Sequence, residues 1–250
     1  MPALPCHVKS RPIEIRGRLQ MVFQDPLTSL NPAMRVAEIV AEPLGIHAKK
    51  KTKSEREHDV SEMLRHVGLD SNLKSRFPHE LSGGQAQRVA IARALIVRPK
   101  VLVCDEAFAA LDGTIRGDIM HLLLAEQADT GLSLIFITHD LSVVRQISHR
   151  VLVLYLGRVC EVASNKQLFE RPRHPYTEAM IRSIPVPDPG AKPDSAPLTG
   201  EASSIINPPS GCTFHPRCQH AIARCSQEIP ALEISGEALV ACHRAAELDL

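Results

Sequence analysis

Two short motifs in the middle of the chain constrain its fold more than any other feature. The first, LSGGQ at Leu81 to Gln85, places two adjacent glycines at the start of a helical pattern. Glycine lets backbone N–H groups approach an anion closely, and a helix N-terminus favours negative charge. The second is the apolar run Val101 to Cys104, which ends in Asp105 and Glu106. Such a run is typical of a buried parallel strand, and ligands bind at the carboxyl ends of these strands.

The residue types in these motifs suit the binding of an anion and a metal ion. An aspartate at the end of a strand can hold Mg²⁺, and a glutamate beside it can orient or deprotonate a water molecule. A glycine turn before a surface helix, or a solvated pair of acids, would explain either motif alone. It explains both motifs in this order much less well, so we interpret them as parts of one site.

The order of the motifs resembles the ATP-binding subunit of an ABC transporter, and the resemblance extends from about Leu19 to the C-terminus. LSGGQ resembles the signature loop, CDE the end of Walker B, and ALD, which ends at Asp112, the D-loop. The fold class that this implies is α/β: a P-loop-NTPase-like ABC ATPase core with a mostly parallel sheet. Residues 18–170 would form a partial ATPase domain, with a helical subdomain at about 34–98.

The resemblance also implies roles for individual residues, with ATP and Mg²⁺ as ligands. Glu106 and His139 would be catalytic, since His139 follows a buried-strand pattern and resembles the switch histidine. Gln24, at the end of another strand pattern, resembles the Q-loop glutamine and would bind nucleotide and Mg²⁺ together with Asp105. The signature loop would contact ATP held by a second ATPase subunit, through Ser82, Gly83, Gly84 and Gln85.

Apolar periodicity predicts the remaining elements. Ser54 and Glu57 form a capping-box pattern at the start of one helix. The other predicted helices are 34–47, 86–97 and 113–129, and the predicted strands are 18–24, 133–138, 151–156 and 159–163, the last two as a hairpin. Residues 1–17 are poorly patterned, and residues 171–210 predict a short helix followed by a proline-rich linker.

Three segments resemble the branch of the family that transports oligopeptides and dipeptides: SLNP at 29–32, HPYT at 174–177, and the tail from Gly211. This implies a subunit that couples ATP hydrolysis to uptake of such peptides, with nickel or glutathione as other solutes. The implied partners are a second ATPase subunit in a homo- or heterodimer, two membrane-spanning permease subunits and, indirectly, a solute-binding protein. The implied location is the cytoplasmic face of the cell membrane, reached through the permease subunits.

Net charge bears on nucleic-acid binding, and hydropathy bears on how the chain reaches the membrane. The formal net charge is +1, which gives no electrostatic case for a nucleic-acid partner. No apolar run approaches the length of a transmembrane helix, so we expect membrane attachment to come through a partner.

The tail at 211–250 contains four of the seven cysteines: Cys212, Cys218, Cys225 and Cys242. Their C-x5-C-x6-C-x16-C spacing lacks the close pair of most zinc sites. Four thiolates suit a [4Fe–4S] cluster, which the resemblance also implies for some members of the branch. A cluster ranks first, reduced thiols without a metal second and zinc third.

The phosphate-loop pattern G-x-x-x-x-G-K-[ST] is absent from the sequence. It should precede Gln24, but a strand–loop–helix–strand unit needs roughly 30 residues or more, and too few precede Gln24. We therefore interpret the chain as an N-terminally truncated form whose activity as an enzyme is uncertain. The alternative is a non-catalytic or degenerate partner subunit that contributes only the signature loop and a metal-bearing tail. A soluble ABC ATPase of DNA repair or translation fits poorly.

Overall fold

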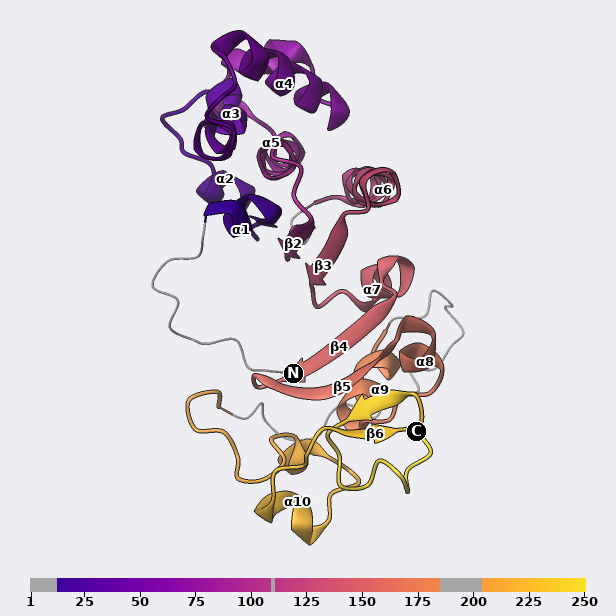
Figure 1. Cartoon of the computed structure of the whole chain (residues 1–250). Coiled ribbons are helices and arrows are strands. Elements are labelled where there is room, and N and C mark those ends of the chain that lie inside the picture. The colour runs from indigo at the N-terminus through magenta and orange to yellow at the C-terminus, as the bar shows by residue number, and fades with distance from the viewer. Residues whose placement is uncertain (1–12, 109–110, 185–203) are drawn as a thin grey trace. The chain divides into compact units, whose positions relative to one another are not determined.

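The structure is a computed structural model that describes residues 13–108, 111–184 and 204–250 (Figure 1). It divides into two compact units, Met1–His139 and Asp140–Leu250. The boundary falls inside the segment 18–170 that the sequence predicted as one partial ATPase domain. None of the helices within the described ranges combines the length and apolar character needed to cross a membrane.

The first unit is built on a parallel sheet of three strands in the order β1-β2-β3. These strands are β1 (Leu19–Val22), β2 (Val101–Asp105) and β3 (Ser133–Ile137). Their register pairs Val22 with Cys104 and Cys104 with Phe136, so the three carboxyl ends lie at the same edge of the sheet. The predicted mixed α/β fold with a parallel sheet is confirmed.

Helices of the first unit gather around α5 (Gly83–Leu95), most of whose residues are buried. It packs against α2 (Pro26–Ser29), α3 (Val36–His47), α4 (Lys53–His66) and β1. The Gly84 backbone lies against the side chain of Ile115 in α6 (Gly113–Thr130), so α5 and α6 share one side of the sheet (Figure 1). The remaining elements are α1 (Ile13–Arg18), η1 (Ser71–Ser75) and η2 (Pro78–Glu80).

Three predicted helix starts were wrong, and one of them is α3, which begins at Val36 instead of residue 34. The N-cap of α4 is Thr52, whose side chain accepts a hydrogen bond from the Glu55 N–H, while Ser54 lies inside the helix. The [ST]-x-x-E pattern occurs twice here, two residues apart, and the first copy caps the helix. Helix α5 begins at Gly83 instead of residue 86, because the Ser82 side chain caps it inside the signature motif.

The second unit is organised around an antiparallel sheet in the order β4-β5-β7-β6. Strands β4 (Arg150–Tyr155) and β5 (Arg158–Ser164) form the predicted hairpin, joined by Leu156 and Gly157, both with positive φ. Two positive φ values in a two-residue loop match the right-handed twist of the strands. The tail adds β6 (Glu233–Ser235) and β7 (Ala238–Val240), and β7 pairs with β5.

The tail therefore shares a core with the segment around the hairpin, instead of forming a body of its own. Phe214 of the tail is buried, and its ring lies 5.3 Å from the rings of both Tyr155 and Tyr176. The helices of this unit are α7 (Leu141–Ile147), α8 (Asn165–Glu170), α9 (Pro175–Arg182), η3 (His215–Arg217) and α10 (Ala223–Gln227). Most of the predicted linker, residues 185–203, lies outside the described residues.

Candidate nucleotide site

Three of the predicted site residues meet at the carboxyl edge of the parallel sheet. Gln24, Glu106 and His139 follow β1, β2 and β3 respectively. The Gln24 Nε2 donates a hydrogen bond of 2.8 Å to Glu106 Oε2. The His139 Nδ1 lies 3.2 Å from Glu106 Oε1, within hydrogen-bond distance. Each oxygen of the Glu106 carboxylate thus has its own partner, one from each neighbouring strand end.

The backbone of Glu106 is held in an unusual conformation. Its φ is +44°, in the left-handed region, which costs a residue other than glycine about 1–3 kcal/mol. Its N–H donates a 2.8 Å hydrogen bond to the carbonyl oxygen of Ile137, the last residue of β3. This bond continues the β2–β3 ladder by one residue and fixes the point from which the side chain leaves the sheet.

The arrangement can support water activation beside a metal ion. A carboxylate held by an amide on one side and an imidazole on the other is oriented to accept a proton from water. Asp105 ends β2 directly before Glu106, and a carboxylate oxygen is a ligand that Mg²⁺ accepts. The side chain of His139 is 76% exposed, so the carboxyl edge is open to a ligand from solvent.

The signature loop is the N-terminus of α5 and lies on a separate element from the Glu106 group. Ser82 Oγ accepts a hydrogen bond from the Gln85 N–H, and Gln85 Oε1 accepts one from the Ser82 N–H. This reciprocal capping box orders the first turn. A Cβ at Gly83 would meet nothing within 4 Å, whereas a Cβ at Gly84 would lie 2.9 Å from the Ile115 side chain. The two glycines therefore differ: one leaves space at the loop, and the other permits close packing.

Asp112, the predicted D-loop residue, is the N-cap of α6. Its Oδ1 accepts a 2.9 Å hydrogen bond from the Ile115 N–H. Because the Ile115 side chain also packs on Gly84, one residue connects the start of α6 with the signature loop. Residues 109–110, which complete the predicted ALD motif, lie outside the described ranges.

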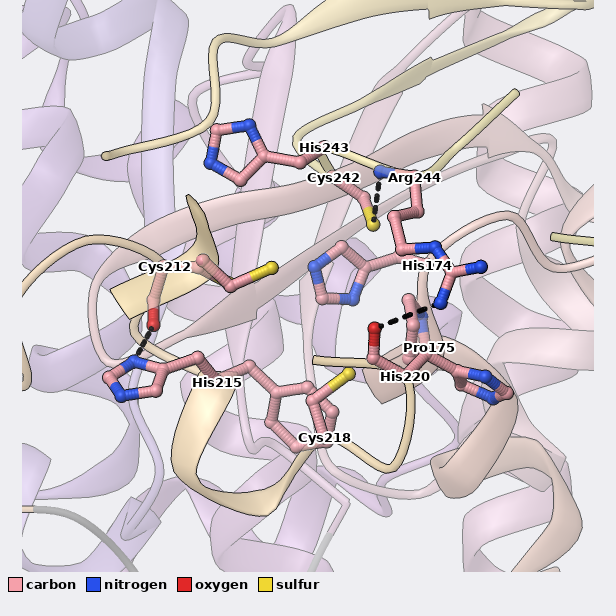
Figure 2. Close-up of a pocket in the computed structure, with 11 residues that line it drawn as sticks. His174, Pro175, Cys212, His215, Cys218, His220, Cys242, His243 and Arg244 are labelled. Atoms are coloured by element: carbon pink, nitrogen blue, oxygen red, sulfur yellow. Dashed lines mark hydrogen bonds between the residues drawn. The ribbon is translucent and has the colours of Figure 1, made fainter. Parts of the chain in front are cut away.

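The four tail cysteines line one small cavity of about 10 Å³. Figure 2 shows the side chains of Cys212, Cys218 and Cys242 pointing toward the same space, with histidines around them. Burial raises the pKa of the Cys218 thiol to about 11. Burial likewise raises the pKa of Cys212 and Cys242. Without a metal these thiols are therefore neutral near pH 7.

The predicted iron–sulfur cluster gains no support from this geometry. Within residues 13–108, 111–184 and 204–250, no three His, Cys, Asp or Glu side chains are grouped so that they could hold a metal ion. Cys212 and Cys218 flank η3, Cys225 lies in α10, and Cys242 follows β7. The four residues share a cavity rather than a single coordination point.

One buried polar group of the second unit was missed by the sequence analysis. Glu161 in β5 is fully buried, and its carboxylate accepts hydrogen bonds from the N–H groups of Arg173 and His174. Burial raises the pKa of this carboxyl. His174 Nδ1 in turn accepts a bond from the Tyr176 N–H and caps α9. The HPYT motif thus begins a helix whose N-terminal end is fixed to the sheet. In the sequence, the only indication of this buried group is a single acidic residue within an otherwise apolar strand pattern.

Two family models match the chain: "ABC transporter" at residues 7–109 and "Oligopeptide/dipeptide transporter, C-terminal region" at residues 160–225. A probable peptide ABC transporter ATP-binding protein of Sinorhizobium fredii is 48% identical over 91% of this chain and 65% of its own length. The oligopeptide transport ATP-binding protein OppF of Salmonella typhimurium is 48% identical over 92% of this chain and 69% of its own length. The chain thus spans about two thirds of the length of these relatives.

A solved structure agrees with the fold. CbiO1 of Clostridium perfringens, part of the ABC transporter complex CbiONQ, matches 63% of this chain and 61% of its own with a TM-score of 0.55 and 36% identity. Fold, motifs and relatives lead to one conclusion: the chain belongs to the ATP-binding subunits of ABC transporters, in the oligopeptide/dipeptide branch.

Proposed function

We propose that this chain is the ATP-binding subunit of an importer for oligopeptides or dipeptides and that Glu106 is its general base. The observation that carries the proposal is the contact of Glu106 with both Gln24 and His139. Glu106 would take a proton from the attacking water, while Gln24 positions that water and the metal ion. His139 would donate a hydrogen bond to the γ-phosphate, where charge develops during phosphoryl transfer.

Mg²⁺ fits this edge because Asp105 and Gln24 offer the oxygen ligands that it prefers. When bound, the ion would neutralise charge on the β- and γ-phosphates. The triphosphate itself needs a cradle of backbone N–H groups and a lysine, which the phosphate loop supplies in such enzymes. No residue of this sequence forms that pattern.

The partners that we propose are a second ATPase subunit and two permease subunits that hold the pair at the cytoplasmic face of the membrane. In the head-to-tail pairing of this family, the signature loop of one subunit completes the ATP site of the other. The capped N-terminus of α5, with open space above Gly83, supports that role for Ser82 to Gln85. Helix N-termini favour anions such as phosphate.

The test is the ATPase activity of the chain bound to its partners, with Glu106→Gln as the key variant. When ATP occupies the site beside Glu106, we expect this variant to lose turnover by at least about 100-fold. The reason is that removing a general base costs 10²–10⁴-fold in rate. Unchanged turnover at a loaded site would contradict the assignment of Glu106.

We also propose that the cysteine cavity holds an iron–sulfur cluster, preferably [4Fe–4S]. The proposal rests on the four cysteines of the tail and their spacing, since four thiolates are the usual ligands of such a cluster. A zinc ion needs four ligands at one point, about 2.3 Å away for sulfur, whereas a cluster binds its cysteines through separate irons.

Iron analysis of protein purified without oxygen tests this proposal. We expect bound iron in the wild type and in Cys160→Ser, because Cys160 is buried in β5 and does not line the cavity. Cys218→Ala should lose it. Colourless wild-type protein without iron, or with stoichiometric zinc, would contradict the proposal.

A further inference from the structure

The side chain of Ile115 in α6 lies directly on the backbone of the signature loop. A Cβ placed on Gly84, in the first turn of α5, would lie 2.9 Å from Cδ1 and 3.0 Å from Cγ2 of Ile115. Both distances are shorter than an ordinary contact between carbon atoms, which is about 3.5–4.0 Å. Glycine at this position therefore allows an approach that a larger residue would prevent.

The backbone of Ile115 belongs to a second fixed point, the cap of α6. Its N–H donates a 2.9 Å hydrogen bond to Oδ1 of Asp112. Ile115 is thus held by its backbone at the start of α6 and packs with its side chain on the first turn of α5. Because the side chain has no free space toward Gly84, a shift of the Asp112 cap would be passed on to the signature loop.

The two helices have a further contact that does not involve the loop. Nη2 of Arg88, one turn into α5, lies 3.4 Å from Oδ2 of Asp118 in α6. Ile119, one turn after Ile115, is fully buried, whereas Ile115 is only partly buried. The packing of α6 therefore has support beyond Ile115, and of these contacts the one that reaches the signature loop is that of Ile115 with Gly84.

The first turn of α5 is the part of the chain that we propose to meet ATP in a partner subunit. Ser82 and Gly83 are exposed, and the space at Gly83 is open, so the N–H groups of this turn are accessible to a phosphate. Hydrogen bonds weaken steeply once the angle at the hydrogen falls below about 120°. The orientation of this turn therefore sets how strongly it binds an anion.

We propose that Ile115 is a positioning residue for the signature loop and that Asp112 acts on the loop through it. Ile115 holds the first turn of α5 in the orientation that binds phosphate, without touching the nucleotide itself. A shift at the start of α6 then changes the affinity of the loop for ATP. This inference rests on the proposed function for its ligand, ATP held by a partner subunit.

The test uses the chain paired with a complete ATPase subunit and compares Ile115→Ala with Ile119→Val. Ile115→Ala should raise the ATP concentration for half-maximal turnover by about threefold or more, with a smaller change in the maximal rate. Ile119→Val is the control, since it removes a methyl group from a buried position in the same helix and should leave both values near wild type. Gly84→Ala added to Ile115→Ala should restore part of the affinity, because its methyl group fills the space that Ile115 leaves.

Hydrogen–deuterium exchange of the isolated chain separates this inference from the proposed function. The amides of residues 83–86 should exchange faster in Ile115→Ala than in Ile119→Val, and Gly84→Ala should slow them again in the double variant. Equal exchange in the two single variants, or equal ATP concentrations for half-maximal turnover, would overturn the inference. So would an effect of Asp112→Ala on ATP affinity that adds fully to that of Ile115→Ala, because Asp112 would then act by another route. A wild-type pair without ATPase activity, together with the expected exchange pattern, would contradict the proposed function and leave Ile115 as the residue that positions the loop.

Discussion

The amide of Gln24 donates a 2.8 Å hydrogen bond to the carboxylate of Glu106, although the two residues are 82 positions apart in the sequence. The contact arises because β1 and β2 are parallel neighbours and both residues follow the carboxyl end of their strand. The group that we assign to water activation is thus assembled by the sheet itself. Nothing in that group holds a triphosphate.

The first prediction concerns the isolated chain, which should bind ATP weakly and not hydrolyse it. The reason is the missing phosphate-loop lysine and hydroxyl, which supply most of the contacts to the β- and γ-phosphates. Calorimetry with Mg-ATP and a steady-state phosphate-release assay measure the two properties. Micromolar affinity, or turnover that Glu106→Gln abolishes, would show that the chain binds the triphosphate by other means.

The second prediction uses the two glycines of the signature loop as a matched pair. Gly84→Ala should destabilise the protein by about 1–3 kcal/mol, because the new methyl group would lie 2.9 Å from the Ile115 side chain. Gly83→Ala should be neutral or slightly stabilising, since that site is open and alanine favours a helix. Urea unfolding measures both. Equal effects would mean that α5 and α6 do not pack as the structure shows.

The third prediction decides between two candidate N-cap residues at the start of α4, Thr52 and Ser54. Thr52→Ala should cost about 1 kcal/mol, the typical value for loss of an N-cap side chain. Ser54→Ala should change the free energy of unfolding by less than about 0.5 kcal/mol, because Ser54 lies within the helix. The reverse order in thermal or urea unfolding would restore Ser54 as the cap.

Much of the nucleotide site could be predicted from sequence. Buried-strand patterns that end in Gln24, Glu106 and His139 imply that the three residues meet if the strands are parallel neighbours, and the structure pairs them so. The left-handed backbone of Glu106 could not be predicted, because it depends on a hydrogen bond to Ile137 that no local pattern encodes.

The tail was harder to predict, because its structure depends on long-range pairing. Strands β6 and β7 have three residues each, too few for a periodic signal, and β7 is defined by its pairing with Glu161 and Val162 of β5. The position of the four cysteines around one cavity likewise depends on this long-range strand pairing. Sequence spacing alone could rank a cluster, free thiols and zinc, but it could not place the sulfur atoms.

The last prediction concerns a pair formed by this chain and a complete ATPase subunit, and it assigns a different role to each of the two ATP sites. In the proposed head-to-tail pairing, the partner's phosphate loop would face the signature loop of this chain, and that site would be chemically whole. The site beside Glu106 has no phosphate loop. Ser82→Arg should therefore abolish turnover, because it removes the cap of α5 and places bulk where the γ-phosphate docks. Glu106→Gln should change turnover by less than about twofold in this pair, because without a phosphate loop no ATP is held beside Glu106 for it to act on.

The most direct test of the account is the ATPase rate of this mixed pair, measured for Ser82→Arg and Glu106→Gln side by side. The account predicts loss of activity with Ser82→Arg and near wild-type activity with Glu106→Gln. Turnover that is abolished by Glu106→Gln and spared by Ser82→Arg would contradict the account.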